Sequence, residues 1–190
     1  MGCLADPPLD VVLLPLIKQY ALQICVETGT YDGRSTRLAS QMFDEVHTIE
    51  INPAFQAGGR ANCQEQGCAN ITFWLGDSRT LLPGLVASLG RQSFFWLDAH
   101  VAAPQFGAVD DWPLLDELDI INTSPWVHII AIDDAHCFDV PRHHAPQRAE
   151  IFERAQQGGY GYWRHPYDII VLAPVSAGSI LDRCLRRELE

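Results

Sequence analysis

The segment VETGTYDG, residues 26–33, lies between a short apolar run ending at Cys25 and the sequence RSTRLASQMF (34–43), which looks helical. Its two glycines are four residues apart, and an acid, Glu27, stands two residues before the first of them. Glycine lets a backbone approach another group closely and adopt a positive φ. A glycine loop between a strand and a helix is also where nucleotide cofactors bind in open α/β sheets. The segment therefore predicts a strand–loop–helix crossover that binds a ligand.

Strand-like and helical patterns alternate along the rest of the chain, without an internal repeat. Strands are predicted at 23–27, 45–51, 70–76, 93–99 and 126–133. Helices are predicted at 9–21, 33–42, 79–88, 112–121, 146–156 and 178–188, and a further helix is expected to begin at Pro53. The helix at 79–88 is expected to break at Pro83-Gly84. The segments 159–166 and 167–174 predict an antiparallel hairpin. Five apolar strands followed by helices favour an α/β fold with a doubly wound, mostly parallel sheet covered on both faces.

Length and composition favour one domain, residues 1–190, of ordinary globular character. The net charge of -11, with 13 basic residues that form no stripe, argues against a nucleic-acid partner. No apolar run approaches the roughly 20 residues that span a bilayer. The 6 cysteines include no CxxC pair, which favours reduced thiols in a cytoplasmic protein.

Every predicted strand ends in an acid, and these ends should share one edge of the sheet. The acids are Glu27, Glu50, Asp77, Asp98 and the pair Asp133-Asp134. Such an edge disfavours a phosphate-rich ligand, and the chain has neither a P-loop motif nor the GxGxxG fingerprint of a dinucleotide site. A ligand with a positive centre, an amino group and ribose hydroxyls fits better. S-adenosylmethionine has all three.

Each of the residues at these strand ends then has an expected role in binding this cofactor. Glu27 accepts from the ammonium group, and Gly29 lets the backbone approach the methionyl part. Glu50, which comes 23 residues after Glu27, is near the spacing that places an acid on ribose hydroxyls. Asp77 accepts from the adenine amino group. The complete set of predicted cofactor-binding residues is Glu27, Thr28, Gly29, Thr30, Gly33, Glu50, Asp77, Ser78 and Asp98.

The motifs VETGTYDGRST, TIEIN, GDS, WLDAH and IDDAH, in this order, resemble those of the class I S-adenosylmethionine-dependent methyltransferases. The resemblance covers about Gln23 to Pro174 and is greatest to small bacterial O-methyltransferases related to those acting on sugars and natural products. It implies a seven-stranded, Rossmann-like methyltransferase sheet with a reversed last strand. Thr30 departs from the family's glycine, a variation that metal-dependent O-methyltransferases tolerate.

The resemblance also implies that Asp98, Asp133 and Asp134 hold a magnesium ion, which would bind vicinal oxygens of the acceptor. Hard oxygen ligands suit Mg²⁺, and three close carboxylates repel unless a cation or protons intervene. Two alternatives stay open: a metal-free site with a histidine base, and a purely structural role for these acids. His100 is favoured over His136 as the base, so the candidate catalytic residues are Asp98, His100 and His136.

The leading hypothesis is therefore methyl transfer to a hydroxyl of a small molecule or sugar, with a homodimer as a further expectation. A cofactor-binding protein without transfer activity is the second hypothesis, because fold does not fix function. A nicotinamide-dependent enzyme is the third, disfavoured by Glu27 and the missing glycine.

Overall fold

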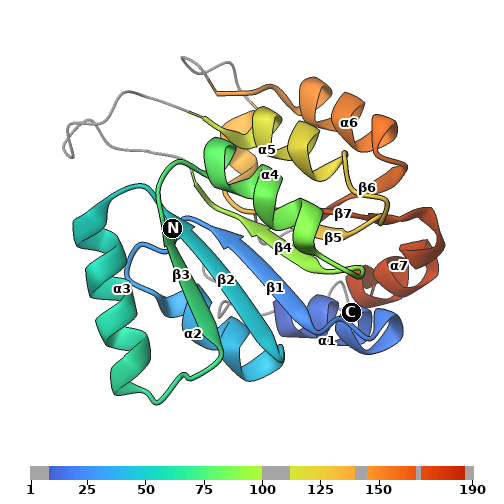
Figure 1. Ribbon diagram of the computed structural model, residues 1–190. Helices are drawn as coiled ribbons and strands as arrows, with labels where there is room; N and C mark the ends of the chain where they lie inside the picture. Colours follow the sequence, from blue (N-terminus) through green and yellow to red (C-terminus); the bar gives the residue numbers. More distant parts are fainter. Residues whose placement is uncertain (1–8, 100–111, 140–144, 166–167, 187–190) are drawn as a thin grey trace.

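The computed structural model describes residues 9–99, 112–139, 145–165 and 168–186, and it centres on a seven-stranded sheet in the order β3-β2-β1-β4-β5-β7-β6 (Figure 1). The strands are β1 (Ile24–Thr28), β2 (Glu45–Glu50), β3 (Ile71–Leu75), β4 (Phe94–Leu97), β5 (Ile129–Ile132), β6 (Tyr160–His165) and β7 (Ile169–Pro174). The first five strands run parallel, whereas β7 is antiparallel to both β5 and β6. The predicted α/β class and the C-terminal antiparallel hairpin are confirmed.

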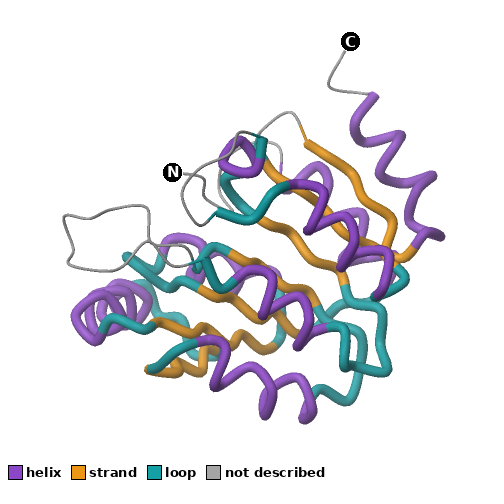
Figure 2. Tube along the Cα trace, turned by 90° about the horizontal axis from the view of Figure 1, so that it is seen from above, coloured by secondary structure: helices purple, strands orange, loops and turns teal. Residues whose placement is uncertain are grey.

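Helices cover both faces of this sheet, as Figure 2 shows from above. They are α1 (Leu9–Tyr20), α2 (Arg34–Met42), α3 (Pro53–Glu65), α4 (Ser78–Ser88), α5 (Leu114–Ile121), α6 (Arg148–Gln157) and α7 (Gly178–Arg186), with short 3-10 turns η2 (Ala135–Phe138) and η3 (Val175–Ala177). Helices α4, α5 and α6 bury side chains against one face, and α1, α2 and α7 against the other. None of the described helices combines the length and the apolar character needed to span a membrane.

The central strands have apolar residues on both faces because each face is covered. Val26 and Phe95 pack with α4, α5 and α6, whereas their neighbours Cys25 and Phe94 pack with α1 and α2. Successive side chains of a strand point to opposite faces, so two buried faces require an unbroken apolar run. The same alternation continues in β4, where Trp96 is fully buried beneath α1 and α2.

Helix α4 differs from the prediction, because it continues through Pro83 instead of breaking there. A proline inside a helix removes one backbone hydrogen bond and crowds the preceding turn. Leu82, Leu85 and Val86 are buried against the sheet on either side of this position. Most helical stability in proteins comes from packing of the apolar face, which here outweighs the local cost of the proline.

The strand order determines which edge of the sheet carries the candidate site. The order reverses between β1 and β4, and the carboxyl ends of the five parallel strands lie along one edge. Because β7 is antiparallel to β5, with Ile170 opposite Ile132, the start of β7 lies at the same edge. Residues that follow the first five strands and residues that precede β7 therefore come together.

Candidate cofactor and active site

Each parallel strand carries an acid at, or within two residues of, its carboxyl end, as predicted. These acids are Glu27, Glu50, Asp77, Asp98 and Asp133. In open α/β sheets, ligands bind outside this edge where the strand order reverses. The candidate site is therefore built from these acids, the glycine loop after β1 and the turn η2 after β5.

Both glycines of the loop adopt left-handed backbone angles, with φ of 90° at Gly29 and 78° at Gly33. A methyl group at Gly29 would collide with the backbone carbonyl of Asp98 at the end of β4. At Gly33 it would lie 2.8 Å from the carbonyl oxygen of Gly59 in α3. The loop thus packs tightly between β4 and α3. A ligand contact at Gly29 stays a prediction.

Glu27 is buried in β1, and its two carboxylate oxygens differ in their surroundings. Oε2 accepts hydrogen bonds from the hydroxyl of Thr36 in α2 and, at 2.6 Å, from that of Thr48 in β2. Oε1 is buried and has no hydrogen-bond partner among the described residues. Burial raises the pKa of Glu27 to about 7, while the two hydroxyl donors oppose the rise and Glu50 and Asp32 add to it. A cationic donor from a ligand would satisfy Oε1 and favour the ionised carboxylate.

Thr30 takes part in the same network, which explains why a threonine is accommodated at this loop position. Its hydroxyl lies 2.5 Å from that of Thr48, so the hydrogen bonds of Glu27 extend into the loop. Thr28, at the end of β1, accepts a backbone hydrogen bond of 3.0 Å from the amide of Asp98. The Thr28 hydroxyl is buried without a hydrogen-bond partner among the described residues.

Glu50 ends β2 and joins the glycine loop to the start of α3. Its Oε2 accepts from the amide of Tyr31 at 3.0 Å, and its Oε1 accepts from the amide of Asn52 at 2.9 Å. Each oxygen keeps a second lone pair, which a ribose hydroxyl could use. Three large apolar side chains are exposed at the ends of β2 and β3: Ile51 (58%), Trp74 (37%) and Leu75 (52%). Exposed apolar residues beside a polar site are typical of a binding surface.

Asp77, the predicted acceptor for the adenine amino group, already accepts hydrogen bonds from within the chain. It is the N-cap of α4 and accepts from the amide of Arg79 at 2.9 Å. The Arg79 guanidinium also donates to both carboxylate oxygens, at 2.7 Å from Nη2 to Oδ2. These hydrogen bonds lower the pKa of Asp77. An adenine amino group would have to share Asp77 with Arg79. Ser78, one of the predicted cofactor-binding residues, is the buried first residue of α4.

The acids after β4 and β5 lie close enough to affect one another, as the strand order predicted. The amide of Asp133 donates to the carbonyl of Leu97 at 3.1 Å, so the two strand ends are joined. Burial raises the pKa of Asp98 well above its ordinary value, and charge repulsion from Asp133, Asp134 and Glu27 raises it further. This repulsion favours a site that holds a proton or a cationic ligand group.

The predicted magnesium ligands do not converge as a set among the described side chains. The group whose potential ligand atoms all lie within 4.8 Å of one another combines Asp134 with His136 and Asp168. Asp133 instead accepts a hydrogen bond of 2.8 Å from the Asp134 amide. Magnesium binding by Asp98, Asp133 and Asp134 stays a prediction, and no step of the chemistry below depends on it.

His136 lies in η2 and contacts Asp168, a residue that the sequence reasoning missed. Asp168 Oδ1 accepts from the His136 amide at 2.7 Å, and Oδ2 is hydrogen-bonded to Nδ1 of the ring. The expected reversal of the last strand was a partial signal, because the start of a reversed strand lies at the edge where the parallel strands end. His100, the favoured base in the sequence reasoning, lies outside the described residues.

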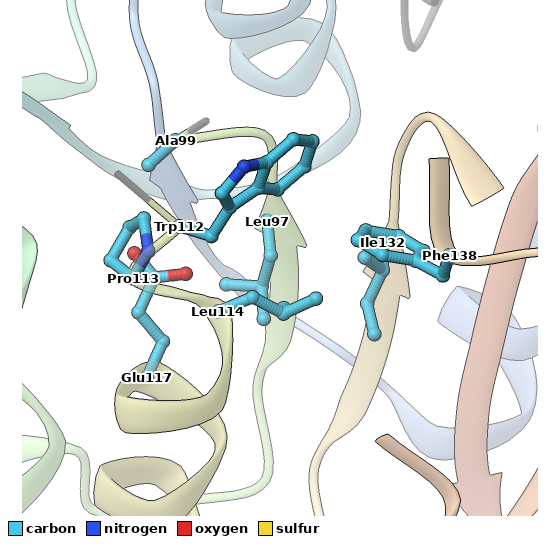
Figure 3. A pocket seen from close by; sticks show the side chains of 8 residues that line it. All are labelled: Leu97, Ala99, Trp112, Pro113, Leu114, Glu117, Ile132 and Phe138. Atoms are coloured by element: carbon cyan, nitrogen blue, oxygen red, sulfur yellow. The ribbon is translucent and has the colours of Figure 1, made fainter. Parts of the chain in front are cut away.

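A small hollow, partly open to solvent, is lined by Leu97 and Ala99, the residues on either side of Asp98 in the sequence (Figure 3). Its lining comes from the end of β4, the start of α5 and the region after β5: Leu97, Ala99, Trp112, Pro113, Leu114, Glu117, Ile132 and Phe138. The rings of Trp112 and Phe138 meet edge to face, 5.8 Å apart. Glu117 is buried, so this mostly apolar pocket contains one carboxylate.

Comparison with known proteins identifies the fold. An O-methyltransferase of tomaymycin synthesis from Streptomyces achromogenes, in complex with S-adenosylmethionine, matches with a TM-score of 0.62 and 16% identity over 90% of this chain and 81% of that chain. A Bacillus cereus O-methyltransferase with bound S-adenosylhomocysteine matches with a TM-score of 0.64 and 16% identity, over 89% and 82% of the two chains. This chain therefore has the fold of the class I S-adenosylmethionine-dependent methyltransferases.

The fold comparison leaves the substrate class open. An rRNA methylase from Streptococcus thermophilus also matches, with a TM-score of 0.57 and 11% identity over 90% of this chain and 98% of that chain. No family model and no curated protein sequence matches this chain. The substrate class must therefore be argued from the residues of this chain.

Proposed function

We propose that this chain is an S-adenosylmethionine-dependent methyltransferase that methylates a hydroxyl group of a small molecule. The observation that carries the proposal is the buried Glu27 carboxylate, whose Oε1 has no hydrogen-bond partner among the described residues. An ammonium group is a donor of the right charge for that oxygen. Glu50, at the end of the next strand, keeps lone pairs for ribose hydroxyls.

The charge of the edge supports this cofactor over a dinucleotide. The five strand-end acids would repel a pyrophosphate, which needs backbone amides and a helix N-terminus free of nearby negative charge. S-adenosylmethionine instead brings a sulfonium and an ammonium group, both positive. The repulsion that raises the pKa of Asp98 would be relieved by such a ligand.

Two observations favour a small acceptor over RNA. The chain carries a net charge of -11, and a surface of this sign repels a phosphate backbone. The pocket between β4, α5 and η2 is small and mostly apolar, and one buried carboxylate lines it. An apolar acceptor with a hydroxyl or amino substituent suits this lining better than a polynucleotide does.

Bound S-adenosylmethionine would supply an electrophilic methyl group, and the chain would supply position and a proton acceptor. Holding two reactants in line accounts for much of the rate of such transfers. The chain would hold the cofactor through Glu27 and Glu50, and the acceptor through the pocket between β4, α5 and η2.

Methyl transfer from radiolabelled S-adenosylmethionine to a panel of phenols, sugars and rRNA fragments tests the proposal. We expect label in at least one small hydroxyl compound and none in RNA. Label in RNA alone would contradict the acceptor class. Cofactor binding without transfer to any compound would favour the binding-protein hypothesis. A parallel series with EDTA tests the predicted magnesium, because a metal-assisted reaction would stop.

A further inference from the structure

Contacts with η2 fix Asp168 at the edge of the sheet that carries the candidate site. The amide of Ala135 donates to its backbone carbonyl at 2.8 Å, and the amide of His136 donates to Oδ1 at 2.7 Å. The antiparallel pairing of β7 with β5 places this residue beside η2, although 32 residues separate it from His136. Its second oxygen, Oδ2, is hydrogen-bonded to Nδ1 of the His136 ring.

This arrangement selects one form of the imidazole. An ionised carboxylate can only accept hydrogen bonds, so the proton of a neutral His136 ring must reside on Nδ1. Nε2 then keeps its lone pair. The His136 side chain is 51% exposed, and its Nε2 lies 3.4 Å from Sγ of Cys137, a weak donor that the acceptor hydroxyl would displace. A carboxylate that orients a histidine in this way is the arrangement by which a histidine is prepared as a base.

We propose that Asp168 is a positioning residue that holds His136 as the Nδ1–H tautomer, so that Nε2 takes the proton of the acceptor hydroxyl. This rests on the proposed function. In the step, the hydroxyl oxygen forms a bond to the methyl carbon, and the carbon–sulfur bond breaks with its electron pair retained on sulfur. The hydroxyl proton goes to Nε2, and Asp168 stabilises the resulting imidazolium. The products are a methyl ether, S-adenosylhomocysteine and a protonated histidine, which returns its proton to solvent.

A structural role alone would leave Asp168 as a cap for the η2 backbone, and Asp168→Asn separates the two roles. The side-chain oxygen of asparagine can still accept from the His136 amide. Its NH2 group can only donate to the ring, so the ring would have to carry its proton on Nε2. Backbone capping is therefore kept while the tautomer is reversed.

Nitrogen-15 NMR of histidine-labelled protein reads the tautomer directly, without a methyl acceptor. We expect the Nδ1–H form of His136 in the unchanged protein and the Nε2–H form in Asp168→Asn, with His136→Gln used to assign the signals. An Nε2–H form in the unchanged protein, or the same tautomer in both, would overturn the proposal. Unaltered backbone amide spectra outside η2 would show that the variant folds.

Methyl transfer to catechol, followed by release of S-adenosylhomocysteine, supplies the kinetic readout. We expect Asp168→Asn to lower kcat at least ~10-fold and His136→Gln ~100-fold, with KM for the cofactor nearly unchanged. Asp139→Asn is the matched control, because it removes an equal charge that pairs with Arg148 instead of His136. Equal rates in Asp168→Asn and the control would overturn the role in catalysis. If S-adenosylhomocysteine fails to bind the unchanged protein, the proposed function fails, and the NMR result still decides whether Asp168 holds the ring.

Discussion

The hydroxyl of Thr48 donates a hydrogen bond of 2.6 Å to Oε2 of Glu27, and this contact between β2 and β1 fixes the carboxylate beneath the glycine loop. Oε2 has two hydrogen-bond donors, whereas Oε1 has none among the described residues. Burial raises the pKa of Glu27 to about 7, so a proton competes with a cationic ligand for this carboxylate. Binding of a cationic ligand and ionisation of this acid should therefore be coupled.

The first prediction concerns stability and pH at Glu27. Its pKa rises from 4.5 in the unfolded chain to about 7 in the folded protein. The stability linked to this proton is present below pH 4.5 and is lost as the pH rises through about 7, by at most ~3 kcal/mol. Glu27→Gln should remove this loss, so its free energy of unfolding, measured in urea at pH 5 and pH 8, should change less than that of the unchanged protein. Equal changes in both proteins would contradict the buried, ligand-free carboxylate.

A second prediction concerns His128, which is buried and makes stability depend on pH in the opposite direction. Burial lowers its pKa from 6.5 to about 4, while its Nδ1 accepts from the amide of Ser93 at 3.0 Å. Its contribution to stability is present above pH 6.5 and is lost as the pH falls through about 4, by at most ~3 kcal/mol. His128→Gln should lower the free energy of unfolding at pH 7. It should also reduce the further loss of that free energy, measured in urea, as the pH falls. The same loss at acid pH in both proteins would show that His128 is not its cause.

The third prediction uses a glycine whose packing the structure explains. Gly29→Ala places a methyl group against the Asp98 carbonyl at a φ of 90°, so both collision and backbone strain oppose it. We expect a loss of ~2 kcal/mol in the free energy of unfolding and weaker cofactor binding. Gly58→Ala in α3 is the control, because a methyl group there meets no atom within 4 Å. It should be neutral or stabilise the helix by up to ~1 kcal/mol. Similar losses for both variants would contradict the packing described for the loop.

A fourth prediction concerns Glu50, which accepts from the amides of Tyr31 and Asn52. Glu50→Ala should weaken binding of S-adenosylhomocysteine at least ~10-fold, since the ribose contact and the loop geometry are lost together. Glu50→Gln keeps an acceptor oxygen and should lose less affinity. Calorimetry on the three proteins distinguishes these cases, and unchanged affinity in Glu50→Ala would exclude a ribose contact.

The sequence predicted the sheet and the positions of its strand-end acids because both follow from local pattern. Apolar runs of strand length mark doubly covered strands, and parallel strands bring their carboxyl ends to one edge. Glu27, Glu50 and Asp98 could therefore be placed before their neighbours were known.

Contacts made between distant segments could not be predicted in this way. The donors from Thr36 and Thr48 to Glu27 depend on how α2 and β2 sit against β1. The pairing of Asp77 with Arg79 depends on a side-chain conformation at the start of α4. Asp168 meets His136 only because the register of β7 against β5 fixes it there. Position along an edge follows from topology, whereas hydrogen-bond partners follow from packing.

Isothermal titration of the unchanged protein with S-adenosylhomocysteine and, separately, with NAD tests the central claim most directly. The carboxylate-lined edge predicts saturable binding of S-adenosylhomocysteine and no heat from NAD at the same concentrations. Tight binding of NAD together with no binding of S-adenosylhomocysteine would contradict it.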